Sequence, residues 1–238
     1  MRKQVLSFGL IFVLCIAPVF VFGQSSEQDS EQEPTVEEVY LESPEFQMIK
    51  QQAFTLNRDT KLQALDNIES MLDEGNLNTG DPQAHYILDY LAMEGTSREV
   101  RENGRLVNYY PVIRKRACEL LGELGGPIAK DSLIKVLLKD NEPMVLAEAA
   151  YALGEIGINP DNDAAKAIAE AMESQNAVAP DNNFAMAGLI AIEKLAEKNE
   201  GINSPDVFDA VIHVAQGNYI TMVKSKAVDV IDALRSFK

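Results

Sequence analysis

One helical segment occurs twice in this chain in nearly the same letters, and this duplication most constrains the fold. RACELLGELG runs from Arg116 to Gly125, and EAAYALGEIG runs from Glu148 to Gly157, 32 residues later. That spacing is too short for two domains and lies in the range of solenoid repeats, whose units bury their apolar faces against one another. The duplication therefore predicts a repeat protein.

The apolar stripe of the segment identifies further copies. In the template, Ala117 is followed at plus three, plus four and plus seven by Leu120, Leu121 and Leu124. This is the spacing of one face of an α-helix. Other copies of the stripe begin at Ala64, Ala149, Gly188 and Ala227. Second stretches with helical periodicity lie between the copies, so we expect five helix pairs.

Proline positions agree with this division, because proline is favoured in the first turn of a helix and excluded from the interior. Of ten prolines, eight lie at or just before an expected helix start: Pro44, Pro82, Pro111, Pro127, Pro143, Pro160, Pro180 and Pro205. The predicted repeats cover residues 44–74, 81–125, 127–158, 160–199 and 204–238.

The segments VIRKRACELLGELG (112–125) and MVLAEAAYALGEIG (144–157) resemble the second helices of HEAT repeats. They are closest to the short bacterial type, in which a valine-arginine pair precedes the alanine. The resemblance covers roughly residues 44–238 and implies an all-α, right-handed solenoid that mostly binds other proteins. A minority of HEAT-like proteins are chromophore lyases or nucleic-acid enzymes, so the fold does not fix the function.

The N-terminus predicts export. Arg2 and Lys3 precede an apolar run, residues 5–22, and small or aliphatic residues then precede a cleavage site after Gly23. Residues 1–23 are therefore interpreted as a signal peptide, and the mature protein is expected in the periplasm or outside the cell. An uncleaved anchor is the alternative, because the run is nearly long enough to cross a bilayer. Lipidation at Cys15 ranks lower, since Val13-Leu14 is a poor lipobox.

Residues 24–43 form an acidic leader with seven acidic residues and no basic residue. This composition is typical of a disordered spacer, although an acidic arm that docks on a basic partner is the alternative. The whole chain carries a formal net charge of −16. Such a charge repels phosphate backbones and argues against nucleic acid as the partner.

No residue pattern indicates catalysis, a cofactor or a metal site. His85 and His213 fall in different repeats, and neither has a second ligand at helical spacing. The run Asp161-Asn162-Asp163 lacks the later glycine and glutamate of a calcium loop and is interpreted as a helix N-cap, as is Asp181-Asn182-Asn183. Cys118 lies within the apolar stripe and is expected to be a core thiol.

Residues 96–110, TSREVRENGRLVNYY, form an insertion that lengthens the spacing between two repeats. Asn103-Gly104 at its centre predicts a two-residue β-hairpin turn. This insertion and the next helix also form the main basic island of the chain. Arginine and tyrosine are common anchors of protein interfaces, whereas pairing with neighbouring acids would make them structural. The candidate partner-binding residues of this island are Arg98, Arg101, Arg105, Tyr109, Tyr110, Arg114 and Arg116.

The non-core positions of the second helices form a second candidate surface, which lines the concave side in HEAT proteins. This second-helix ridge is acidic at one end and more apolar at the other, which suits a protein or peptide partner. Its candidate residues are Glu119, Glu123, Tyr151, Glu155, Ile190 and Lys194. The leading hypothesis is a non-catalytic interaction scaffold of the cell envelope. The alternatives are a ligand-handling or lyase-like protein and a membrane-tethered spacer.

Overall fold

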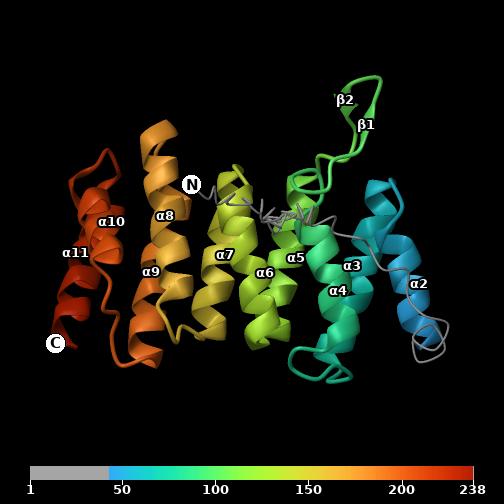
Figure 1. The fold of residues 1–238 in the computed structure, drawn as a ribbon, viewed down its shortest axis with the longest axis horizontal. Helices are drawn as coiled ribbons and strands as arrows, with labels where there is room; N and C mark the ends of the chain where they lie inside the picture. The colour runs from blue at the N-terminus through green and yellow to red at the C-terminus, as the bar shows by residue number, and fades with distance from the viewer. Residues whose placement is uncertain (1–42, 238) are drawn as a thin grey trace, which may run out of the picture. The chain divides into compact units, whose positions relative to one another are not determined.

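The computed structural model describes residues 43–237, and this part of the chain folds into ten α-helices and one β-hairpin (Figure 1). The predicted signal peptide and all of the acidic leader except Ser43 lie outside the described residues. The first five helices are α2 (Pro44–Ala53), α3 (Arg58–Asp73), α4 (Pro82–Ala92), α5 (Pro111–Leu124) and α6 (Gly126–Lys139). The others are α7 (Pro143–Ile156), α8 (Asp163–Val178), α9 (Asn182–Lys198), α10 (Pro205–Gln216) and α11 (Thr221–Ser236). The hairpin strands are β1 (Arg101–Glu102) and β2 (Arg105–Leu106).

The helices pack in two layers. The first helices of the pairs (α2, α4, α6, α8, α10) contact one another in chain order, and so do the second helices (α3, α5, α7, α9, α11). Each first helix also packs on the second helix of its own pair. Every unit therefore contacts mainly its neighbours, which is the defining property of a solenoid. The expectation of an all-α solenoid is confirmed.

Prolines and polar caps mark the helix starts. Five helices have proline as their first residue: α2, α4, α5, α7 and α10. The Asp81 carboxylate accepts hydrogen bonds from the N–H groups of Gln83 and Ala84, each at 3.0 Å. Asp181 accepts the N–H of Phe184 at 2.8 Å, which confirms the predicted cap of α9. These bonds satisfy N–H groups that have no partner within the helix.

The predicted cap of α8 is only partly right: within the predicted run, Asp163 accepts the N–H of Ala164 at 2.8 Å. Asn162, immediately before the helix, has φ = 58° and makes no side-chain cap. The upstream Asn159 instead accepts the N–H of Ala165 at 3.2 Å, and Asn159 is itself only 2% exposed. The tight turn after Pro160 bends the chain so that the earlier asparagine reaches the helix start.

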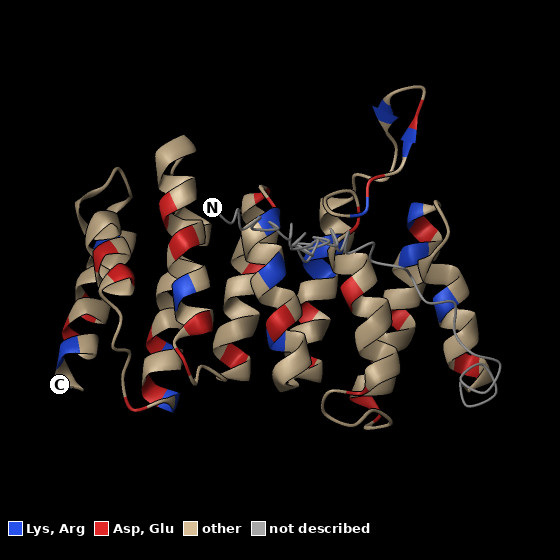
Figure 2. Cartoon of the chain, in the orientation of Figure 1, with Lys and Arg blue, Asp and Glu red and all other residues tan. Residues whose placement is uncertain are grey.

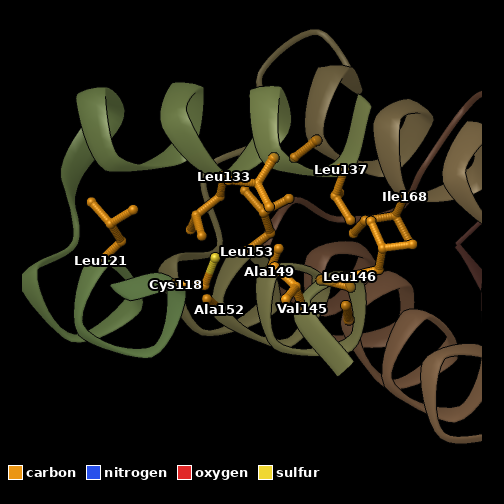
Figure 3. Close-up of a cluster of buried hydrophobic side chains, with 14 of the residues drawn as sticks. Cys118, Leu121, Leu133, Leu137, Val145, Leu146, Ala149, Ala152, Leu153 and Ile168 are labelled. Atoms are coloured by element: carbon orange, nitrogen blue, oxygen red, sulfur yellow. The ribbon is translucent and has the colours of Figure 1, made fainter. Parts of the chain in front are cut away.

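The apolar stripes of both layers meet in one continuous core. Figure 3 shows its centre, where Leu133 and Leu137 of α6 and Ile168 of α8 lie against residues of α5 and α7. Cys118 lies among them with no exposed surface, and burial raises the pKa of its thiol far above the ordinary value. Its placement as a core thiol agrees with its position in the stripe.

Candidate functional site

The hairpin forms where Asn103-Gly104 predicts it. Both turn residues have positive φ, 49° for Asn103 and 78° for Gly104, as a type I′ turn requires. The antiparallel register pairs Arg101 with Leu106 and Glu102 with Arg105. Figure 1 shows the hairpin projecting beyond the ends of the neighbouring helices, so its tip is open to a partner.

A buried carboxylate anchors the base of the hairpin. Glu94 is 1% exposed, and its two oxygens accept hydrogen bonds from Lys61 Nζ and Asn108 Nδ2, each at 2.8 Å. The Asn108 side chain also accepts the N–H of Val100 at 2.8 Å, and thereby ties the two arms of the insertion together. Because each of these polar groups has a partner, the network fixes the direction in which the hairpin leaves the solenoid.

Arg114 belongs to this buried base and not to the surface, so its prediction as a partner-binding residue is wrong. Its guanidinium is fully buried and binds both oxygens of Asp140, at 2.5 and 3.1 Å. Nη1 also donates to the carbonyl of Glu94 at 3.1 Å. Burial opposes the charged form, but the hydrogen bonds to Asp140 outweigh it and raise the pKa of Arg114.

The other arginines of the basic island divide between the exposed tip and internal contacts. Arg101 pairs with Glu99 at 2.8 Å, and the Arg98 guanidinium lies 5.0 Å from the Tyr90 ring centroid. Arg116 bridges to Asp66 at 2.6 Å and also to Glu69, across the contact between α5 and α3. Arg105 is exposed at the tip. The pairing with acids that was the alternative in the sequence therefore holds for Arg101 and Arg116, although Arg116 uses acids of the preceding repeat.

The two tyrosines at the hairpin base have different roles. Tyr110 donates from its hydroxyl to the carbonyl of Leu56 at 3.1 Å and is half-buried. Tyr109 is 47% exposed, its hydroxyl donates to Glu142 at 3.1 Å, and its ring lies 4.7 Å from the Arg114 guanidinium. Tyr109 thus connects the hairpin to the start of α7.

Ion pairs cross the second-helix ridge between adjacent repeats. Lys115 of α5 pairs with Glu148 of α7 at 2.9 Å. Lys194 of α9 pairs with Glu155 of α7, and its ammonium lies 4.5 Å from the Tyr151 ring centroid. The hydrogen bond between these two side chains raises the pKa of Lys194 and lowers that of Glu155. The predicted ridge residues Glu155 and Lys194 therefore also join neighbouring units.

The remaining ridge residues are placed as follows. Ile190 is half-buried, whereas Glu119 and Glu123 are exposed at the acidic end of the ridge. Burial and the nearby Glu119 and Glu69 carboxylates raise the pKa of Glu123. Tyr151 is 43% exposed at the centre of the ridge.

A groove of about 590 Å³ lies at Tyr151, between the first turns of α7 and α9, and we call it the α7–α9 groove. Met144, Ala147, Tyr151 and Ala187 supply its apolar surface. Lys115, Glu142, Glu148, Asp181 and Asn183 supply polar groups around it. Since Tyr109 bonds to Glu142, the groove and the hairpin base are adjacent, and the structure brings the two predicted surfaces together.

Sequence reasoning missed most of this groove. Tyr151 was selected, but Glu142, Met144, Ala147 and Ala187 were not. Met144 is 40% exposed and lies in the first turn of α7, a helix that consists mostly of apolar residues. An exposed methionine one residue after a helix-starting proline was the available signal, because core positions of that helix begin only at Val145.

The side chains of His85, Ser132 and Asp89 form a cluster between α4 and α6 that contains the residue types of a hydrolase triad. Ser132 is 1% exposed, and its hydroxyl donates a hydrogen bond to Asp89 Oδ1 at 2.5 Å. His85 Nε2 lies 3.0 Å from the hydroxyl oxygen of Ser132. Serine bridges the other two groups, whereas a nucleophilic triad needs histidine in the middle as the base. Burial lowers the pKa of His85. The arrangement is that of a partly buried hydrogen-bond chain between two helices.

Among residues 43–237, no group of three or more His, Cys, Asp or Glu side chains is arranged to hold a metal ion. None of the helices in the same range combines the length and hydropathy needed to cross a bilayer.

The paired helices, the two layers and the repeated contacts between successive units define an α-solenoid. Residues 105–179 match the family model of HEAT repeats, and this match supports the HEAT repeat family expected from the sequence. The matched segment extends from β2 through α8 and includes most of the residues that line the α7–α9 groove. No curated protein matches the chain.

Proposed function

We propose that this protein is a non-catalytic interaction module that binds a protein partner in the α7–α9 groove, beside the base of the hairpin. The groove itself carries the proposal, since it combines an apolar surface with polar groups that could fix the orientation of a bound segment. HEAT repeats generally mediate contacts between proteins. Both surfaces selected from the sequence meet at this point of the solenoid.

The hairpin supplies a second contact. Its base is fixed by the Glu94 network, so the tip residues Arg101 and Arg105 are presented in a defined direction. A pre-organised contact costs less conformational entropy on binding than a mobile one. The hairpin would add affinity and orientation to a complex centred on the groove.

The proposal is tested by affinity capture from an extract of the source cells, followed by identification of the captured protein. Ala187→Tyr fills the groove, and Ala177→Tyr places the same side chain at an exposed position of α8 as the matched control. We expect a specific partner to be lost with Ala187→Tyr and retained with Ala177→Tyr, at unchanged melting temperature. Equal capture by both variants would exclude the groove.

The role of the hairpin is tested separately with the double variant Arg101→Ser and Arg105→Ser. Both side chains are exposed, so the fold is expected to stay intact. Capture should weaken without being abolished. If capture is unchanged, the groove acts without the hairpin tip.

We also propose that the protein is exported, on the basis of Arg2, Lys3 and the apolar run at residues 5–22. Mass spectrometry of the mature N-terminus tests this directly. Cleavage after Gly23 is expected, and retention of the first residues would instead favour the membrane-tethered alternative.

A further inference from the structure

The charges around the α7–α9 groove indicate the chemistry of its occupant. Three of the polar lining residues are acids, Glu142, Glu148 and Asp181, and one is basic, Lys115. Lys115 is already paired with Glu148 at 2.9 Å. The acidic groups that remain to face a partner are therefore Glu142 and Asp181, one at the start of α7 and one at the start of α9.

Each of these two carboxylates has accepting capacity left. Oε2 of Glu142 accepts the Tyr109 hydroxyl, and Oδ1 of Asp181 accepts the Phe184 N–H. A carboxylate offers about four lone-pair sites, so both groups can accept further hydrogen bonds from a bound cation.

The helix starts at the groove do not favour an anion, although helix N-termini often bind one. The first residue of α7 is Pro143, which has no N–H to donate. In α9 the Phe184 N–H is taken by Asp181. Both starts are also next to a carboxylate, which offsets the partial positive charge of the helix.

The apolar surface and the tyrosine ring of the groove indicate that the bound partner also has apolar side chains, in addition to a cationic group. Met144 and Tyr151 are 40% and 43% exposed, and the groove reaches from Lys115 on α5 to Ala187 on α9. Neighbouring helix axes lie about 8–10 Å apart, so three second helices span roughly 20 Å. An extended segment of about six residues covers this distance.

From this geometry we propose that the α7–α9 groove binds an extended peptide segment that alternates basic and aliphatic side chains. The basic side chains bind Glu142 and Asp181, and the aliphatic side chains pack on Met144, Ala147 and Tyr151. The chain's net charge of −16 also favours a cationic partner through long-range attraction. This inference rests on the proposed function, because it names the partner chemistry of the same groove.

The test measures fluorescence anisotropy of two labelled hexapeptides with the full-length mature protein. One peptide alternates arginine and leucine, and the other alternates glutamate and leucine. The variant Glu142→Gln with Asp181→Asn removes two charges, yet it retains an acceptor for Tyr109 and a capping side chain for α9. The control, Glu197→Gln with Asp209→Asn, removes two exposed charges elsewhere.

We expect the arginine-leucine peptide to bind at least ten-fold more weakly to the groove variant and unchanged to the control. Stronger binding of the glutamate-leucine peptide would overturn the cationic assignment, as would equal binding of the arginine-leucine peptide by the groove variant and the parent protein. Ala187→Tyr separates the two proposals. If it blocks whichever peptide binds, the groove remains a docking site even when the cationic assignment fails. If it blocks neither, the proposed function fails as well.

Discussion

We call the contact between two successive second helices a seam. The two inner seams of the solenoid and the two outer ones differ in the residues that form them. In the inner seams, α5 with α7 and α7 with α9, a glycine meets a small residue of the next helix. A Cβ on Gly122 would lie 2.8 Å from Ala152 Cβ, and one on Gly154 would lie 2.9 Å from Ala191 Cα. These distances leave no room for a side chain, so the helices approach as closely as their backbones allow.

The outer seams, α3 with α5 and α9 with α11, use charge at the equivalent positions. Glu69 and Glu193 replace the glycine, and they pair with Arg116 and Lys226 of the next helix. Larger residues, Leu120 and Val230, replace the alanines, and these helix pairs make fewer close contacts than the inner pairs. One template therefore supports two kinds of seam, and the choice depends on one position within the apolar stripe and one position beside it.

Burial, and not charge itself, should decide how much each contact contributes. The sharpest test is Arg114, whose ion pair with Asp140 is fully enclosed at the hairpin base. Arg114→Met leaves Asp140 buried without its partner, and we expect a loss of about 3–5 kcal/mol in the free energy of unfolding. Urea denaturation measures it.

The control for Arg114 is the double variant Arg114→Met with Asp140→Asn. Neutralising Asp140 removes the unpaired charge, while the amide oxygen still accepts the Glu142 N–H, as the carboxylate does at 2.9 Å. The double variant should be more stable than the single one. Equal stability of the two would show that lost packing, and not the buried charge, causes the effect.

The inner seam is tested by Gly154→Val. The new side chain must push against the Ala191 backbone, so we expect a loss of about 2–3 kcal/mol. Thermal unfolding measures it against Ala177→Val, which changes helix propensity at an exposed position. If the two variants are equally stable, the inner seam is not closely packed.

An outer seam is tested by Arg116→Met, which keeps the apolar stem and removes the pairs to Asp66 and Glu69. The Arg116 side chain is 28% exposed, so we expect a loss of about 1 kcal/mol, and salt should reduce the difference from the parent protein. Urea denaturation at low and high salt gives both values. A loss as large as that of Gly154→Val would contradict the ranking of the two seams.

The smallest effect is expected for the exposed pair of Lys194 and Glu155. The pKa of Glu155 is lowered, so its stabilisation is present above the unfolded value of 4.5 and is lost as pH falls through the folded value. Lys194→Met should therefore lower stability slightly at neutral pH, and the difference should disappear in acid. Denaturation curves across this pH range test the sign, and a difference that grows in acid would contradict it.

The sequence predicted the solenoid and the hairpin because both depend on local patterns. The stripe at Ala117, the prolines and Asn103-Gly104 each act within a few residues of chain. The misplacement of Arg114 has a different cause. Arg114, Ala117, Cys118 and Leu121 share one buried stripe, but an arginine is assigned to the surface unless its partner is known, and Asp140 lies 26 residues further along the chain.

The groove was only partly visible for the same reason. Tyr151 was selected as an outward-facing position, whereas Ala187 and Asp181 reach the groove from the next repeat. The acidic partners of Arg116 likewise come from the preceding repeat and not from the neighbours in sequence. Contacts between repeats depend on the rotation of one unit against the next, which periodicity does not specify.

The sequence by itself determined the repeat, its five helix pairs and the position of the hairpin, because helical periodicity, proline and turn residues are local constraints. The tertiary structure decided which charges are buried, which join repeats and which face the groove. Those outcomes depend on side chains from helices that are distant in the chain and on the space left between them. In this protein a glycine lies against an alanine at the two inner seams, whereas a glutamate at the same position pairs with a basic residue at the two outer seams.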